Sequence, residues 1–518
     1  MSAKERIVIG DSVGNLIAGS IGKQTQQLHS MKASPIFALI AGTTVVRLAF
    51  AATTGLGVDE SYMVTAGRVL CLGYFDHPPA SWWLSWGAAH LFQTEAPWAV
   101  RLPFIGLFAL SQVLVWRIAL LAENQRAAFW SVVTLNLSPV FSVTTGTWVL
   151  PDGPMDAALL GAALCMLHAL AAGKQTALGW WSATGLCAGL ALFSKYSSVL
   201  TIWGAFLYLL TSRLHRHWLV RPEPYIAAGL ALAVFSPVLV WNAEHGWVSF
   251  LFQGDRAAGL RFHPFLPIQT LAGEALFVLP WVWLPMMILF AHGLWGNVAW
   301  RHRLLIWLAA PPIVVFAIIS AWSSQRILYH WAAPGYLMLF PLVGDVLARH
   351  VNRSWVRGIL AGSVGLIIIS LAAIATQIQF DWLGRSLSGF LQRDPTQEGL
   401  DWVSIRHDLG TRGLLHEGAL IGALNWRDAG KIGYALGPAI KMLCLSRDSR
   451  QFGFASPLAY SIGDDVLLLS VEPSGPPFRW FNSVQVLPDT AVRLDGRVLK
   501  KVGVERGFGL RLPLGDKD

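Results

Sequence analysis

Acidic residues that could act in catalysis lie at three points of the chain, and prolines stand close to two of them. Asp59 and Glu60 are adjacent in a Val-Asp-Glu-Ser-Tyr segment, while Asp76 and His77 precede two prolines. Asp152 lies in a Pro-Asp-Gly-Pro turn. Because proline fixes the backbone around it, a neighbouring carboxylate keeps a defined direction and can accept a proton from a hydroxyl group as a general base. The alternatives are solvated loop acids at Asp59 and Glu60 and a helix N-cap at Asp152.

Cationic and aromatic side chains occur at the ends of apolar segments. Arg101 opens one segment in Val-Arg-Leu-Pro, and Lys195 and Tyr196 lie between two others in Ser-Lys-Tyr-Ser. Arg326 and His330 share a further link. Carboxylates and cations together suit the transfer of a sugar from a lipid phosphate, in which a base takes the acceptor's proton and cations stabilise the leaving phosphate. The alternatives are snorkelling to headgroups for Arg101 and Lys195, and an interfacial structural role for His330.

The composition indicates what kind of scaffold carries these residues. Hydrophobic residues make up 54% of the 518, charged residues only 13%, and the mean hydropathy is +0.50. A soluble domain carries about 25% charged residues, so a soluble multidomain enzyme and a disordered chain are both excluded. The net charge of +9 does not indicate nucleic-acid binding, because the Lys and Arg residues lie in short links between apolar segments. No nucleotide cofactor is expected, since sugar transfer from a lipid phosphate needs none.

Apolar blocks of about 20 residues recur along the first three quarters of the chain, and each is long enough to cross about 30 Å of hydrocarbon as a helix. The sequence therefore predicts an all-α polytopic membrane domain with eleven spans. They are expected at residues 35–56, 99–121, 127–149, 155–172, 178–193, 197–212, 224–241, 272–291, 304–320, 332–347 and 357–376.

Basic and acidic residues occupy alternate links between the expected spans. The basic links contain Arg117, Arg126, Lys174, Arg213, Arg216, Arg221, Arg301, Arg303, Arg349, Arg353 and Arg357. The opposite links contain Asp59, Glu60, Asp76, Glu95, Asp152, Glu244 and Asp255. By the positive-inside rule the basic links face the cytoplasm. We therefore expect a cytoplasmic segment at 1–34, a transmembrane catalytic domain at 35–379 with its first outward loop at 57–98, and an outward soluble domain at 380–518.

The composition changes after about Phe380. Short apolar runs at Ala419–Leu424, Ile440–Leu445 and Val466–Val471 alternate with turn-rich segments. Apolar residues at helical spacing occupy Trp426–Leu436, between the first two runs. This alternation predicts a small C-terminal α/β domain.

The ordered motifs resemble those of the bacterial branch of the GT-C glycosyltransferases, the superfamily of aminoarabinose transferases and protein O-mannosyltransferases. The resemblance covers roughly residues 35–380. It rests on Asp59-Glu60, Asp76-His77-Pro-Pro, Arg101-Leu-Pro, Pro-Asp152 and Ser-Lys195-Tyr196, in that order. It implies a GT-C fold of about 11–13 transmembrane helices in the bacterial inner membrane, with a cytoplasmic N-terminus and a small periplasmic C-terminal domain.

The resemblance also implies roles for the candidate residues. The first-loop acid of the family corresponds to Asp59 as a catalytic residue, with Asp152 beside it, and Lys195 corresponds to a lipid-phosphate contact. The remaining candidates are expected to bind substrate: Glu60, Asp76, His77, Arg101, Tyr196, Arg326 and His330. A divalent metal is associated with this type of loop, and its candidate ligands here are Asp76, Glu244 and His245, with His330 as a further possibility.

One motif departs from the family pattern. The aminoarabinose enzymes tend to have Glu-Lys-Pro-Pro where this chain has Asp76-His77-Pro-Pro. A lysine, which is cationic at neutral pH, is thereby replaced by His77, which is cationic only when it is protonated. This difference leaves the identity of the donor sugar open.

The expected function is transfer of a sugar from undecaprenyl phosphate to a periplasmic-side hydroxyl of lipid A or of another glycan or lipid. Two alternatives remain: a protein O-mannosyltransferase, and a non-enzymatic transporter or flippase of a lipid-linked sugar. A transporter is expected to place ionisable groups near mid-membrane and often has paired halves. Here these groups lie near the outer edge and the sequence shows no internal repeat. The expected partners are the lipid-linked donor, a lipid, glycan or protein acceptor and membrane lipids, but no nucleic acid.

Overall fold

The computed structural model describes residues 34–257, 262–322, 327–383, 395–416, 418–471 and 477–511. Contacts divide the chain into two compact units, Met1–Val45 and Val46–Asp518. The described part of the first unit is the beginning of helix α2 (Ser34–Thr53), which continues into the second unit. All the contacts described below lie within the second unit.

Most of the described residues between Ser34 and Phe380 are helical. After α2 the helices are α3 (Val58–Ala66), α4 (Ala80–Leu91), α5 (Pro97–Ala122), α6 (Gln125–Leu137), a π-helical segment (Val140–Thr145), α7 (Asp152–Ala171), α8 (Lys174–Ser194), α9 (Ser198–Thr211), a 3₁₀ turn (Arg216–Val220), α10 (Glu223–Glu244), α11 (Val248–Ala257), α12 (Leu266–Val278), α13 (Pro280–Trp295), α14 (Trp300–Ile319), α15 (Ala333–Leu337), α16 (Phe340–His350) and α17 (Ser354–Phe380). Among the described residues, seven helices are long and apolar enough to cross a membrane, namely α2, α5, α7, α8, α10, α14 and α17. The protein is therefore a multi-pass membrane protein.

Four of the eleven expected spans are not single long helices, and prolines explain three of them. Residues 127–149 divide into α6 and the π-helical segment at Pro139, because a residue before proline avoids the helical conformation. Residues 272–291 divide before Pro280 into α12 and α13, a pair bent by 118° that would make an eighth span. Residues 332–347 divide into α15 and α16, each with a proline in its first turn. The fourth, α9, is an apolar helix of only 14 residues.

The C-terminal part forms the predicted small α/β domain. Its elements are a 3₁₀ turn (Pro395–Gly399), α19 (Val403–Thr411), β1 (Leu420–Ala423), α20 (Trp426–Leu436), β2 (Lys441–Cys444), α21 (Phe452–Ala455), a 3₁₀ turn (Leu458–Ser461), β3 (Val466–Ser470), a 3₁₀ turn (Pro477–Trp480), β4 (Phe481–Leu494) and β5 (Arg497–Leu510). The strand order is β2-β1-β3-β5-β4. Strand β1 pairs in parallel with β2 and β3, and β5 pairs in antiparallel fashion with β3 and β4. The three apolar runs of the sequence are thus the parallel strands.

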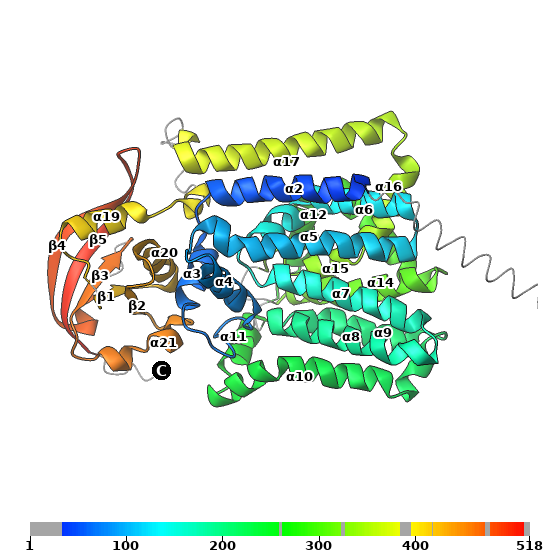
Figure 1. Ribbon diagram of the computed structural model, residues 1–518, viewed down its shortest axis with the longest axis horizontal. Helices are drawn as coiled ribbons and strands as arrows, with labels where there is room; N and C mark the ends of the chain where they lie inside the picture. The colour runs from blue at the N-terminus through cyan, green and yellow to red at the C-terminus, as the bar shows by residue number, and fades with distance from the viewer. Residues whose placement is uncertain are drawn as a thin grey trace, which may run out of the picture. The chain divides into compact units, whose positions relative to one another are not determined.

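Helix α3 lies where the helical part meets the C-terminal part, and it packs against α20 (Figure 1). The two helices approach closely at a glycine. A Cβ atom at Gly430 would lie 2.8 Å from the Cα atom of Tyr62. The Thr65 hydroxyl donates a 3.1 Å hydrogen bond to the Gly430 carbonyl. One hydrophobic core contains Tyr62 and Trp82 of the first loop together with Ile421 and Phe452 of the C-terminal part, so these two regions fold around a shared core.

Candidate active site

Helix α3 carries the two adjacent acids Asp59 and Glu60 in its first turn. The Glu60 carboxylate turns back to accept a 2.9 Å hydrogen bond from the backbone N–H of Gly57, just before the helix. This contact satisfies one of the unpaired N–H groups at the helix start. Since adjacent helical residues point in different directions, Asp59 and Glu60 enter different surroundings.

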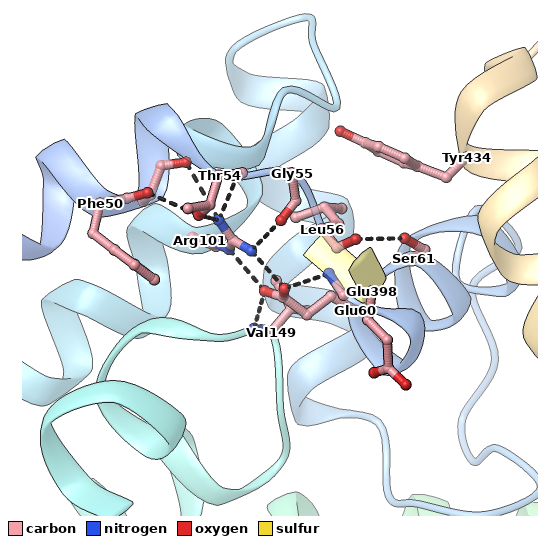
Figure 2. Close-up of polar contacts among 12 residues, drawn as sticks. Phe50, Thr54, Gly55, Leu56, Glu60, Ser61, Arg101, Val149, Glu398 and Tyr434 are labelled. Carbon is pink, nitrogen blue, oxygen red and sulfur yellow. Dashed lines mark hydrogen bonds and ion pairs between the residues drawn. The ribbon is translucent and has the colours of Figure 1, made fainter. Parts of the chain in front are cut away.

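Glu60 forms a buried, two-point ion pair with Arg101 of α5, which Figure 2 shows. The Nε–Oε1 distance is 2.8 Å and the Nη2–Oε2 distance is 2.6 Å. The Val149 N–H also donates to Glu60, and Arg101 donates further to the carbonyls of Thr54 and Gly55. Burial opposes ionisation of Glu60, but Arg101 and the two N–H groups reverse this, so the pKa of Glu60 is lowered.

Glu60 and Arg101 therefore form their hydrogen bonds with each other and with neighbouring backbone groups. Arg101 neither snorkels nor meets solvent, since only 1% of its surface is exposed. The pair joins α3 to α5, and the expected substrate contacts of both residues stay a prediction. The pair fixes the end of the helix from which Asp59 projects.

Asp59 differs from its neighbour, because its side chain is exposed and no described residue forms a hydrogen bond or ion pair with it. The surrounding protein still removes part of its hydration and raises its pKa, while Arg450 and Arg427 act in the opposite direction. A raised pKa makes the carboxylate a stronger base once it is ionised. Asp59 is therefore an unpaired carboxylate on a rigid helix, as a general base requires.

Asp76 is buried beside α3. Tyr62 donates its hydroxyl to Asp76 Oδ1 at 3.3 Å, and Arg450 Nη1 lies 3.5 Å from Oδ2. Gln253 donates to the Asp76 backbone carbonyl at 2.6 Å. Burial and, to a smaller extent, the nearby Asp59 raise the pKa of Asp76 to about 6, against the opposing charge of Arg450. Asp76 therefore changes its charge close to physiological pH.

The third acid, Asp152, forms a buried ion pair with Lys195, with Nζ 2.8 Å from Oδ1. Asp152 is the first residue of α7, and the N-cap position before it is occupied by Pro151. His77 and His330 lie close enough to interact with it electrostatically. Lys195 thus has a carboxylate as its partner within the protein, and its contact with a lipid phosphate stays a prediction. Tyr196, next in the chain, packs its ring against Phe250 at 5.0 Å between centroids.

Two of the predicted metal ligands lie at the end of α10. Glu244 is exposed at the end of α10, and His245 stacks on Trp241 with its Nδ1 2.7 Å from the Trp241 carbonyl oxygen. Arg326 lies outside the described residues. Among the residues that the structure describes, no group of three or more His, Cys, Asp or Glu side chains is arranged to hold a metal ion. The predicted metal ligands Asp76, Glu244 and His245 therefore do not form such a group.

Sequence reasoning missed a further acid, Asp156, one turn after Asp152 in α7. It is buried, with 3% of its surface exposed, and neither carboxylate oxygen has a hydrogen-bond partner among the described residues. It is close to Thr145, without a hydrogen bond of good geometry between them. The signal was available, because an acid inside an apolar span is rare and commonly functional.

The C-terminal part contributes side chains to the same region. Lys431 of α20 is buried and donates to the carbonyls of Leu56, Glu398 and Leu400 at 2.8, 2.9 and 2.8 Å. Burial lowers its pKa to about 7. The Leu56 carbonyl lies two residues before α3, so Lys431 joins the start of this helix to the C-terminal part. No sequence motif marks Lys431, because its role depends on where α20 packs.

Comparison with known proteins identifies relatives of this fold. Residues 76–241 match the model of the dolichyl-phosphate-mannose-protein mannosyltransferase family. The crystal structure of ArnT from Cupriavidus metallidurans bound to undecaprenyl phosphate superposes with a TM-score of 0.61 and 16% identity over 91% of this chain and 98% of that one. Its apo structure gives the same TM-score, 15% identity and coverages of 92% and 98%. Comparison with the curated proteins gives no match. The predicted fold is thereby confirmed, since the chain has the fold of ArnT, and the family match over residues 76–241 agrees with the resemblance seen in the sequence motifs.

Proposed function

We propose that this GT-C-fold protein is an integral-membrane glycosyltransferase that moves a sugar from a polyprenyl phosphate, such as undecaprenyl phosphate, to an acceptor hydroxyl. The donor class is supported by the fold, because ArnT from Cupriavidus metallidurans has been crystallised with undecaprenyl phosphate. The fold by itself does not assign an activity. The main observation behind the proposal is the difference between two adjacent acids. Asp59 has no ion-pair partner among the described residues, while Glu60 forms a buried ion pair with Arg101.

Asp59 is assigned the role of general base. As the acceptor oxygen bonds to the anomeric carbon, its proton passes to the Asp59 carboxylate. The bond from that carbon to the phosphate oxygen breaks at the same time, and the polyprenyl phosphate leaves with the electron pair. Asp152 is the less suitable base, because its carboxylate is already paired with Lys195.

Lys195 is assigned to the leaving phosphate. A buried ammonium group beside Asp152 keeps a fixed position and can share its charge with an incoming phosphate. His77 and His330 interact electrostatically with the same carboxylate. Interactions that strengthen as negative charge develops on the leaving group accelerate the reaction itself.

The acceptor is assigned to lipid A or another glycan or lipid on the periplasmic side. A second candidate, a protein acceptor, is favoured by one observation: the matching family model is that of protein mannosyltransferases. The proposal places residues 1–34 in the cytoplasm and the segments 57–98 and 380–518 in the periplasm of a bacterial inner membrane. Alkaline phosphatase fused after Gln377 should be active, and activity of a cytoplasmic reporter there instead would invert this topology.

The test is sugar transfer by the purified protein in detergent or nanodiscs. Polyprenyl-phosphate-linked pentoses and hexoses are supplied with lipid A, a glycolipid or a peptide, and the released polyprenyl phosphate and the modified acceptor are identified by mass spectrometry. Asp59→Asn should lower the rate by about 10²–10⁴-fold while the fold is retained. The matched control is Asp464→Asn, which changes an exposed aspartate before β3 and should leave the rate unchanged.

Three outcomes would change the assignment. If Asp152→Asn is inactive while Asp59→Asn turns over normally, Asp152 is the base. If both variants transfer sugar at the normal rate, the acids have no catalytic role. If the protein transfers no sugar from any donor but moves a labelled lipid-linked sugar across a vesicle membrane, the protein is a transporter.

A further inference from the structure

The turn that precedes α21 inserts from the C-terminal part into the first loop. Gln451 in this turn is fully buried, and its backbone N–H donates to the Tyr62 hydroxyl oxygen at 3.0 Å. Its side-chain oxygen accepts a 2.9 Å hydrogen bond from the Phe75 N–H. The next residue, Phe452, packs its ring against Tyr62. The turn is therefore bound to two neighbours of Asp76. One is Tyr62 of α3, whose hydroxyl contacts the Asp76 carboxylate, and the other is Phe75, which precedes Asp76 in the chain.

Arg450 precedes Gln451 and is aimed at Asp76. Its φ angle of 48° lies in the left-handed region, which is uncommon for a residue with a side chain. Its guanidinium group stacks over the Trp426 ring at 3.7 Å from the centroid, and Nη1 lies 3.5 Å from Asp76 Oδ2. An unusual backbone conformation that is held by its surroundings is a reason to look for a function.

The positive charge of Arg450 acts on two carboxylates: Nη1 lies 3.5 Å from Asp76 Oδ2, and Asp59 interacts with the guanidinium group electrostatically. The two acids also interact with each other, and like charges at close range disfavour ionisation of both. A cation that acts on both acids offsets this effect. The other charged or titratable groups that face Asp59, Asp76 or Arg450 are Arg427, Glu60, Glu398, Asp448, Tyr62 and Tyr196.

We propose that Arg450, supplied by the C-terminal part, is a positioning residue that holds Asp59 and Asp76 together in their ionised forms for sugar transfer. The inference rests on the proposed function, since it assigns Arg450 to the same reaction. It also gives the C-terminal part a role at the site. Without the guanidinium charge, the two acids would retain a proton at a pH where the base must be free to accept one.

The test is the pH dependence of sugar transfer in two variants that keep a side chain at the left-handed position. Arg450→Gln removes the charge, and Arg450→Lys retains it. An opposite charge within about 4–6 Å lowers the pKa of an Asp by about 1–3 units, so Arg450→Gln should move the acidic limb of kcat/KM upward by about one pH unit or more. Much of the activity should return at alkaline pH. Arg450→Lys should keep the acidic limb near its wild-type position.

A purely structural contact gives a different result, a loss of activity by the same factor at every pH, and this would overturn the proposal. An unchanged profile would overturn it as well. If thermal unfolding shows that Arg450→Gln does not fold, the pH profile of Trp426→Leu tests the proposal instead. This variant removes the ring that orients the guanidinium group. An upward shift of its acidic limb supports the proposal, and an unshifted limb contradicts it.

The matched control is Arg412→Gln, which removes another arginine from an ion pair in the C-terminal part, with Asp408. Its pH profile should match the wild type. The wild-type protein separates failure of this inference from failure of the proposed function. If it transfers sugar while Arg450→Gln shows no pH shift, only the inference is wrong, whereas absence of transfer at every pH would overturn both.

Discussion

The buried ion pair between Glu60 and Arg101 allows a quantitative prediction. Glu60→Gln keeps the size of the side chain but removes its charge, so the guanidinium group stays buried without a counter-ion. The exposed fractions are 3% for Glu60 and 1% for Arg101, and the contacts are 2.6 and 2.8 Å long. Removing one member of such a pair costs about 3–5 kcal/mol of stability. Arg101→Met should cost a similar amount, because it leaves the carboxylate unpaired.

The double variant separates pairing from packing. With both charges removed, no buried charge is left unpaired, so the double variant should be at most as unstable as either single variant. The coupling energy should therefore be about 2 kcal/mol or more, near the upper part of the range for residues in contact. It is measured by chemical denaturation in detergent micelles, followed by tryptophan fluorescence and circular dichroism. Additive losses in the double variant would refute the idea that the two charges depend on each other.

The chain offers a matched control for this cycle. Arg68 and Glu95 form a similar two-point contact, at 2.8 and 2.7 Å, in the same first-loop region. Their side chains are 18% and 17% exposed. If one charge is removed, water can therefore solvate the remaining charge in part. Glu95→Gln should therefore cost about 1 kcal/mol or less. The Glu60 effect should also depend on pH: because its folded pKa is lowered, its contribution is complete above about pH 4.5 and is lost as the pH falls through the folded pKa.

Three further measurements test other parts of the site. Lys195→Met should raise the KM for the polyprenyl-phosphate donor by about 10–150-fold, the equivalent of about 1.5–3 kcal/mol for a charge-assisted contact, and an unchanged KM would exclude a phosphate contact. Burial raises the pKa of Asp76 to about 6, so the folded state binds its proton more tightly than the unfolded state does. The wild-type protein should then lose about 2–3 kcal/mol of stability from this group as the pH rises from about 4 to above 6, and Asp76→Asn should remove this dependence from the denaturation curves. Lys431→Met should leave three buried carbonyls without their donor and lower the stability by about 3 kcal/mol or more, whereas a loss below 1 kcal/mol in the same assay would show that water replaces the ammonium group.

The fold could be predicted in outline because it follows from apolar periodicity. The long helices α5, α7, α10, α14 and α17 correspond to expected spans, since a continuous apolar block in a membrane protein has few alternatives to a helix. The breaks at Pro139 and Pro280 were overlooked because hydropathy ignores the backbone restriction that proline imposes. The proline positions, added to the hydropathy, would have divided these segments.

The long hairpin of β4 and β5 was also missed, although the sequence contains a strong signal for it. Asp495 and Gly496 connect the strands, and both have positive φ angles, 49° and 77°. An Asp-Gly pair between two segments of alternating polarity is among the strongest local indications of a hairpin. The parallel strands were easier to find, because their buried residues form continuous apolar runs.

The candidate site was only partly predictable, because its local motifs are visible in the sequence and its long-range contacts are not. Asp59, Glu60, Asp76 and Asp152 stand out in the sequence because of their motifs. Arg450 and Lys431 do not, since each is an ordinary cation of the C-terminal part until α20 and the following turn pack against α3. Sequence spacing says nothing about a contact that spans more than 370 residues, such as that between Asp76 and Arg450.

Asp59 and Glu60 show how the fold gives two adjacent acids different properties. They share the first turn of α3, yet the pKa of Asp59 is raised and that of Glu60 is lowered. The difference comes from partners rather than from position in the sequence: Glu60 meets Arg101 and two N–H groups, while Asp59 meets no hydrogen-bonding partner among the described residues. Carboxylates whose surroundings shift their pKa values apart commonly have separate roles in catalysis. One acid fixes the helix, so that the other can remain free to take a proton.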